Sequence, residues 1–159
     1  MEYRVSAGEE FARVAAALRT VDSRLPGDFR EELKRAVRPL VARAKEKVRN
    51  LPVHGVKHTG LRRRVAAGVG MRVSTSRNPG IRVTTSMRDP SEASLPHHLD
   101  DPRGWRHPVF GNRHVWVTQH TGGAWFSRTI ADGRDDIARD LHGVLERAAE
   151  TVADAGGRV

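Results

Sequence analysis

The chain has 159 residues, which fits one domain, and its 38% hydrophobic and 30% charged residues are typical of a globular protein rather than a disordered one. It contains no cysteine, which excludes disulfides and thiolate metal sites, and no secretory signal or membrane-spanning run is recognisable, so we expect a soluble protein. The net charge of +9 is carried mainly by arginine and would attract polyanions, although GC-rich coding produces the same excess of arginine.

The first part of the chain is predicted to hold a strand or arm, followed by a helix. Residues 2–6 fit either a short strand or an arm. Apolar residues then recur at helical spacing, which predicts a helix from about Gly8 to about Arg24. Pro26 and Gly27 would end this helix.

A second and longer helix is predicted to start near Asp28 and to run to Leu51 along one apolar stripe. Pro39 lies inside it, removes one backbone hydrogen bond and should kink the helix or split it in two. The opposite face is rich in lysine and arginine. A solvated surface is the ordinary role of such a face, and a surface that meets phosphates is the alternative.

The middle of the chain is predicted to form a β-hairpin. A turn-rich connector covers residues 50–60, and Leu61–Ala67 fits either a helical turn or the start of a strand. Apolar residues then alternate with polar ones over 69–75 and 81–85, on either side of Asn78-Pro79-Gly80. Such alternation around a turn is typical of an antiparallel hairpin.

The last part of the chain completes the predicted fold class. Residues 88–112 are polar and contain four prolines, so we expect a long irregular loop that reaches outside the domain. A further strand is predicted over 114–119, and a final amphipathic helix runs from Ser127 to Gly156-Gly157. The predicted class is α+β: an antiparallel sheet, made of the hairpin and the further strand, with long amphipathic helices packed on one face.

The histidines are the first place to look for chemistry. Five of the eight lie close together in the sequence: His97, His98, His107, His114 and His120. Their spacing is not the i, i+4 spacing of a helical zinc motif, and no cysteine can complete a site. No nucleophile elbow or glycine-rich phosphate loop is present. We therefore expect no enzymatic activity, no metal and no cofactor, and we keep a metal-dependent hydrolase built on the histidines as the least favoured hypothesis.

The strongest local signal for nucleic acid is Arg62-Arg63-Arg64, which follows Thr59 and Gly60. These arginines would contact DNA or an acidic partner, but no helix-turn-helix or zinc-finger pattern accompanies them. The aromatic residues that could stack on bases have more ordinary roles. We expect Trp116 to lie in the core and Trp125 and Phe126 to anchor the final helix.

Two segments carry a resemblance to a known family. The first is Leu51-Pro52 followed, after a short gap, by Thr59-Gly60-Leu61-Arg62. The second is His107-Pro108-Val109-Phe110-Gly111-Asn112, then Trp116-Val117 and Gln119, then Trp125-Phe126. In order and spacing they resemble the small neck proteins of long-tailed bacteriophages, which are called tail-completion or head–tail connector proteins. The resemblance covers roughly Asp28 to Val152.

The resemblance implies a structural virion protein rather than an enzyme. Such proteins act in the neck of the virion, after assembly in the host cytoplasm, as a ring that matches the six-fold tail. Their partners are copies of themselves, neighbouring neck proteins and the tail tube or terminator, and the genome passes through their central channel. Tail-terminator, head-closure and tail-completion roles stay open. The alternative is a basic, nonspecific DNA-binding protein of a mobile element.

The motif residues are expected to have structural roles. Thr59 and Gly60 would form a turn or cap before a buried Leu61. Pro108, Phe110 and Gly111 would set the return of the loop into the sheet, or touch a neighbouring subunit. The expected organisation is an N-terminal arm and helix at 1–27, a tail-completion-like α+β domain at 28–155 that contains the loop at 88–112, and a C-terminal tail at 156–159.

Overall fold

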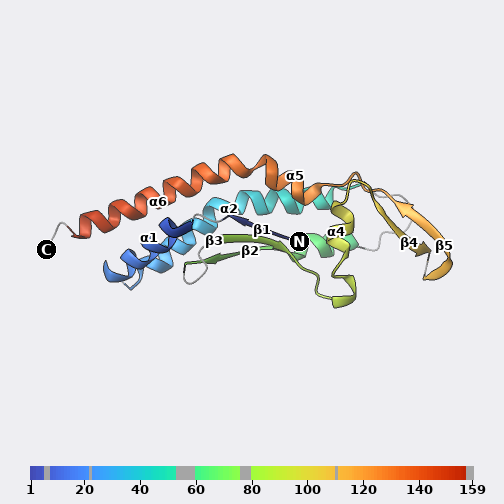
Figure 1. Cartoon of the computed structure of the whole chain (residues 1–159), viewed down its shortest axis with the longest axis horizontal. Helices are drawn as coiled ribbons and strands as arrows, with labels where there is room; N and C mark the ends of the chain where they lie inside the picture. The colour runs from blue at the N-terminus through green and yellow to red at the C-terminus, as the bar shows by residue number, and fades with distance from the viewer. Residues whose placement is uncertain (6–7, 22, 53–59, 76–79, 110, 157–159) are drawn as a thin grey trace. The chain divides into compact units, whose positions relative to one another are not determined.

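The computed structural model describes residues 1–5, 8–21, 23–52, 60–75, 80–109 and 111–156 (Figure 1). In chain order, the elements are β1 (Glu2–Val5), α1 (Gly8–Val21), α2 (Leu25–Arg49), α3 (Leu61–Gly68), β2 (Val69–Ser74), β3 (Gly80–Thr85), the 3₁₀ helix η1 (Pro90–Glu92), α4 (Leu95–Asp100), β4 (Trp105–Val109), β5 (Asn112–Gln119), α5 (Trp125–Asp132) and α6 (Arg134–Gly156). Helices combined with antiparallel sheets confirm the predicted α+β class.

The chain forms two compact units. The first unit contains Met1, Ala42–Gly70 and Thr84–Asp132, and the second unit contains Glu2–Val41, Met71–Val83 and Gly133–Val159. Each unit therefore draws on segments that are far apart in the sequence.

A three-stranded sheet has the strand order β1-β3-β2. The predicted hairpin of β2 and β3 is confirmed, and the N-terminal segment is a strand beside β3 rather than an arm. Along β3, Ile81 and Val83 are fully buried, whereas the intervening Arg82 is only half-buried. The period-two alternation thus gives this strand one covered face. Of the predicted turn, Asn78 and Pro79 lie outside the described residues.

The helices of the second unit bury an apolar core. Phe11 of α1 and Phe29 of α2 are buried, and their ring centroids lie 5.4 Å apart. Helix α1 also packs against α6, on which Ile137 and Leu141 are buried, and Leu33 of α2 is fully buried. Full burial of side chains of this size contributes about 1.5–3 kcal/mol each. Tertiary packing rather than helix propensity therefore holds these helices.

Helix α2 begins earlier than predicted and is not split. It starts at Leu25, so Pro26 and Gly27 lie in its first turn, and α1 ends at Val21. Proline suits a first turn because the N–H there has no partner within the helix. The split expected at Pro39 is absent. Pro39 is exposed, so water can satisfy the backbone carbonyl that loses its N–H partner.

The expectation of a long irregular loop at 88–112 is wrong. This segment contains η1, α4 and β4. Pro90 and Pro96 stand in the first turn of η1 and α4, where proline is favourable, and Asp89 accepts a hydrogen bond from the backbone N–H of Ser91. Pro108 lies in β4, which pairs only with β5 among the described strands and so tolerates a residue without an N–H. Pro90 and Pro96 therefore begin helices and Pro108 occupies an edge strand, so these prolines do not indicate a loop.

The further strand predicted at 114–119 is present as β5, but it belongs to a different sheet. It pairs antiparallel with β4, whereas the β2–β3 hairpin is extended by β1. The predicted sheet of hairpin plus this strand is therefore wrong. A strand that follows its partner after a tight turn closes the shortest loop, which favours the local pairing.

Two further segments differ from, or decide between, the predicted elements. Residues 61–68 form helix α3, which settles the alternative between a helical turn and a strand. The final helix is two helices, α5 and α6, with Gly133 between them. Glycine is the poorest helix former apart from proline, so it is a natural place for the break.

Candidate functional site

The second motif of the resemblance folds into the β4–β5 hairpin of the first unit (Figure 1). The register pairs Trp105 with Gln119 and Pro108 with Trp116, and it is irregular between Pro108 and Val109. Gly111 closes the hairpin with a positive φ of 79°, a conformation that favours glycine. Phe110 lies outside the described residues. Pro108, the register irregularity and Gly111 therefore all lie where the chain reverses direction between β4 and β5.

One face of this hairpin carries an aromatic and polar cluster. The rings of Trp105 and His107 lie 5.6 Å apart, and His98 of α4 stacks on Trp105 with a ring distance of 5.9 Å. The His107 Nε2 atom lies 3.2 Å from the side-chain oxygen of Gln119, within hydrogen-bonding distance. Motif residues His107 and Gln119 thus hold the two strands together near the base of the hairpin.

The other face carries Trp116 beneath an arginine. The Arg106 guanidinium carbon lies 5.5 Å from the centre of the Trp116 ring, and the indole N–H donates to the backbone carbonyl of Arg113 at 2.7 Å. Trp116 is nevertheless 45% exposed, so the prediction that it lies in the core is wrong. Its neighbours Val115 and Val117 are 49% and 41% exposed. Successive residues of a strand point to opposite faces, so apolar side chains lie uncovered on both faces.

The base of the hairpin is fixed by a buried carboxylate. Asp100, at the end of α4, accepts hydrogen bonds from the backbone N–H of Phe126 at 2.6 Å and of Ser127 at 3.2 Å. These N–H groups belong to the first turn of α5, which has no partners for them within the helix. The hydroxyl of Thr121 donates to the carbonyl of Leu99 at 3.0 Å. The segments that enter and leave the hairpin are therefore tied to each other.

Two glycines let these segments approach closely. A Cβ atom at Gly104 would overlap the Gln119 carbonyl, and one at Gly123 would overlap the backbone of Pro102. Both glycines also have positive φ angles, of 74° and 54°. Sequence reasoning missed the role of Asp100. An aspartate that caps a helix 26 residues away leaves no local pattern.

Trp125 and Phe126 are buried, as expected, with their rings 5.4 Å apart. They open α5, which lies between β5 and the final helix. Leu61 is half-buried rather than buried, and Gly60 precedes α3 with a positive φ of 72°. Thr59 lies outside the described residues.

Leu51 and Pro52 of the first motif lie near the segment between β5 and α5, at a groove of about 550 Å³ in the first unit. Its lining includes Arg43, Lys47, Leu51, Pro52, Thr121 and Gly122. Pro52 therefore lies close to the segment between β5 and α5. Sequence order alone does not predict that Pro52 and this connecting segment lie close together.

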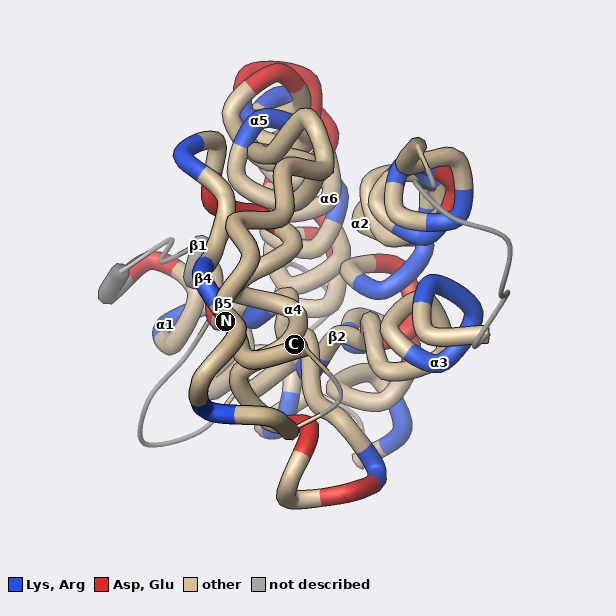
Figure 2. The backbone as a smooth tube through the Cα atoms, turned by 90° about the vertical axis from the view of Figure 1, so that its right-hand side faces the viewer, with Lys and Arg blue, Asp and Glu red and all other residues tan. Residues whose placement is uncertain are grey.

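The three consecutive arginines of α3 have different surroundings. The Arg62 guanidinium donates to the carbonyl of Leu51, and Arg64 forms an ion pair with Glu92 at 2.6 Å, which raises the pKa of Arg64. Only Arg63 has no hydrogen bond or ion pair within the described part of the chain. Figure 2 shows further lysines and arginines along α2. Two of the three predicted DNA contacts thus serve the fold.

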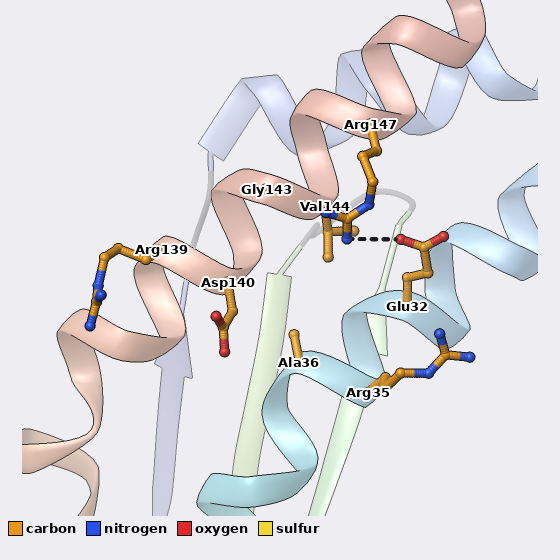
Figure 3. Close-up of a pocket in the computed structure, with 8 residues that line it drawn as sticks. All are labelled: Glu32, Arg35, Ala36, Arg139, Asp140, Gly143, Val144 and Arg147. Atoms are coloured by element: carbon orange, nitrogen blue, oxygen red, sulfur yellow. Dashed lines mark hydrogen bonds and ion pairs between the residues drawn. The ribbon is translucent and has the colours of Figure 1, made fainter.

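A second groove, of about 320 Å³, lies between α2 and α6 in the second unit (Figure 3). Ala36 and Gly143 keep the side chains short there, and Arg147 pairs with Glu32 across it at 3.2 Å. Arg35, Arg139 and Asp140 complete a charged lining. The groove brings no nucleophile together with a base.

Among the described residues, no group of three or more histidine, aspartate or glutamate side chains is arranged to hold a metal ion. His97 and His98 lie on α4, His107 on β4 and His114 on β5, and the His98 ring stacks on Trp105. The helices described here are also too short or too polar to cross a membrane.

Comparison of the chain with protein-family models, with curated proteins and with solved structures gave no match.

Proposed function

We propose that this protein is a structural, non-enzymatic component of the neck of a long-tailed bacteriophage or prophage. It would join or complete the tail at the head–tail interface, as part of a ring around the DNA channel. The observation that carries the proposal is the β4–β5 hairpin: the motif that resembles neck proteins forms an exposed element on a fixed base. An assembly protein needs such an element, because it must present a defined surface to a neighbour before the neighbour arrives.

Two further features support this proposal. The hairpin exposes Val115, Trp116 and Val117 together, and adjoining exposed apolar side chains on a soluble protein mark interaction surfaces. Pro52 of the first motif also lines a groove with Gly122, which stands between Gln119 and Trp125 of the second motif. The residues that carry the resemblance therefore lie in one unit of the fold.

Deletion of the gene, followed by electron microscopy of the particles, tests the proposal. We expect DNA-filled heads and separate tails, and we expect the added purified protein to restore joining. Normally joined, infectious particles from the deletion strain would refute the neck role. A Val21→Ala protein, altered at an exposed apolar residue of α1, serves as the control for restoration because that site lies outside the motif.

Nonspecific DNA binding is the second candidate, and a specific observation favours it. The basic side chains Arg43, Lys47 and Arg49 of α2, with Arg63 of α3, are exposed and have no ion pair within the described ranges. Cations without an ion pair are available to bind phosphates. Each phosphate contact steepens the slope of log binding constant against log salt concentration by about 0.9.

Fluorescence anisotropy with duplex DNA at several salt concentrations tests this second candidate. Replacing Arg43, Lys47 and Arg63 with glutamine should weaken binding and flatten its salt dependence. A matched set at Arg13, Arg35 and Arg72, exposed on the second unit, should have a smaller effect. Equal effects of the two sets would mean that net charge alone causes the binding, and would refute a DNA-binding surface at Arg43, Lys47 and Arg63.

A further inference from the structure

Strand β5 of the β4–β5 hairpin has no covering layer within the described part of the chain. Two-stranded sheets are marginally stable in water unless a third strand or a packed layer covers them. Here β5 has eight residues, of which all but Gln119 are exposed, and β4 is its only described strand neighbour. Because the base is fixed by Asp100, the hairpin keeps its shape while its apolar side chains stay in water. These features point to a surface that another molecule covers.

Charge restricts what that molecule is. Residues 102–131 contain four arginines and three histidines and no aspartate or glutamate. Arg106 and Arg113 lie on the two strands of the hairpin, next to the exposed apolar residues. Pairing of two such hairpins would place arginines near arginines without a carboxylate between them, which is unfavourable. The complementary surface is therefore an acidic one.

The chain itself offers an acidic surface on α6. Between Arg134 and Gly156, six carboxylates stand against three arginines, so this helix has a net charge of −3 in a chain of net charge +9. Ile137, Leu141 and Val144 face the core, and Glu146 and Glu150 are exposed on the other side. The exposed Ala149 and Ala153 lie beside them at helical spacing. This face combines carboxylates with small side chains over which flat apolar groups can lie.

We propose that the β4–β5 hairpin of one molecule docks on the outward face of α6 of a second copy of this chain. Val115 and Val117, which share one face of β5, cover Ala149 and Ala153, while Arg113 on the same face meets Glu146 and Glu150. The inference rests on the proposed function in one respect: a closed ring of identical chains joins two different surfaces of the same chain.

Disulfide trapping tests this contact in the purified full-length protein. The chain contains no cysteine, so each introduced cysteine is the only thiol of its molecule. One protein carries Val115→Cys, and a second protein, with a tag of different size, carries Ala149→Cys. After mixing and mild oxidation, we expect a disulfide-linked heterodimer several-fold more abundant than with Ala16→Cys. That control is an alanine of α1 that, like Ala149, is exposed.

Charge reversal separates a specific contact from chance collision. Arg113→Glu in the first protein should reduce the trapped heterodimer to the control level. Glu146→Arg with Glu150→Arg in the second protein should restore it. A yield equal to the Ala16→Cys control, a yield unchanged by charge reversal, or preferential linking of Val115→Cys to itself would each overturn the proposal. Because no virus particle is involved, these results stay independent of the gene deletion that tests the neck role.

Discussion

The two hairpins of this protein look alike in sequence and differ in what covers them. In β2–β3, a third strand, β1, is added beside β3, and Ile81 and Val83 are fully buried. In β4–β5, no third strand is added within the described part of the chain, and Val115 and Trp116 are close to half exposed. Alternation thus predicts a strand in both places, but it does not say where the covering layer comes from.

A finer feature of the pattern distinguishes the two strands. On β3, apolar Ile81 and Val83 alternate with the polar Arg82 and Thr84, which is typical of a strand with one buried face. On β5, Val115, Trp116 and Val117 are consecutive, so both faces are apolar. Such a run fits a strand buried inside the fold or one covered on assembly, and the fold here leaves it exposed. This comparison is open to experiment.

The largest expected effect is on the covered hairpin. Ile81→Ala removes a fully buried side chain and should lower the free energy of unfolding by about 2–5 kcal/mol. Val115→Ala, on the other hairpin, should change it by less than about 1 kcal/mol, because that side chain is already in water. Urea denaturation of the full-length protein measures both. Similar losses from the two substitutions would mean that β5 is covered in the free protein.

The base of the exposed hairpin should be the next most sensitive place. Asp100→Ala leaves the buried N–H of Phe126 without its acceptor and should cost about 2 kcal/mol. Asp101→Ala is the control, because within the described residues the Asp101 carboxylate bonds to Arg103 in its own turn and not to α5. Urea denaturation gives the stability, and hydrogen exchange of the β4–β5 amides reports whether the hairpin opens first. Equal stability losses from the two substitutions would contradict the role of Asp100 as the tie between α4 and α5.

The exposed hairpin should matter for assembly rather than for folding. Trp116→Ala loses its contact with Arg106, which contributes about 0.5–1 kcal/mol at an exposed site. We therefore expect a nearly unchanged midpoint in urea, together with a strong loss of head–tail joining in the complementation assay. Val21→Ala is the control for an exposed apolar residue elsewhere. Full joining activity with Trp116→Ala would show that this face is not the working surface.

Much of the fold follows from local patterns, and the errors share one physical cause. The α1 and α2 helices and the β2–β3 hairpin could be predicted, because their buried apolar residues recur along the sequence at helical or alternating spacing. The prediction of a loop at 88–112 is wrong because proline occurs both in loops and in the first turn of helices, and only the surrounding contacts show that Pro90 and Pro96 begin helices. Trp116 was placed in the core because large aromatic residues are usually buried.

The residues of the candidate site also fall into those that the sequence could predict and those that it could not. Its motif residues could be named from the sequence, because they lie next to one another along the chain. The residues that hold it could not: Asp100 caps α5 across 26 residues, and Gly104 owes its importance to a carbonyl that arrives from β5. Such contacts depend on the tertiary structure and leave no periodic trace.

The smallest expected effect concerns acid stability at the base of the exposed hairpin. The guanidinium and backbone N–H of Arg103 both donate to Asp101 and lower the pKa of its carboxyl from 3.8 to about 2. A carboxyl with a lowered folded-state pKa stabilises the fold above its ordinary pKa and loses that contribution as the pH falls toward about 2. The stability difference between the unmodified protein and Asp101→Asn should therefore be present at neutral pH and shrink over that acid range. Because the Arg103 side chain of this ion pair is exposed, the difference should also shrink in high salt. Urea midpoints of both proteins at several pH values measure it, and a difference that grew on acidification would show that Asp101 is not held as its charged form.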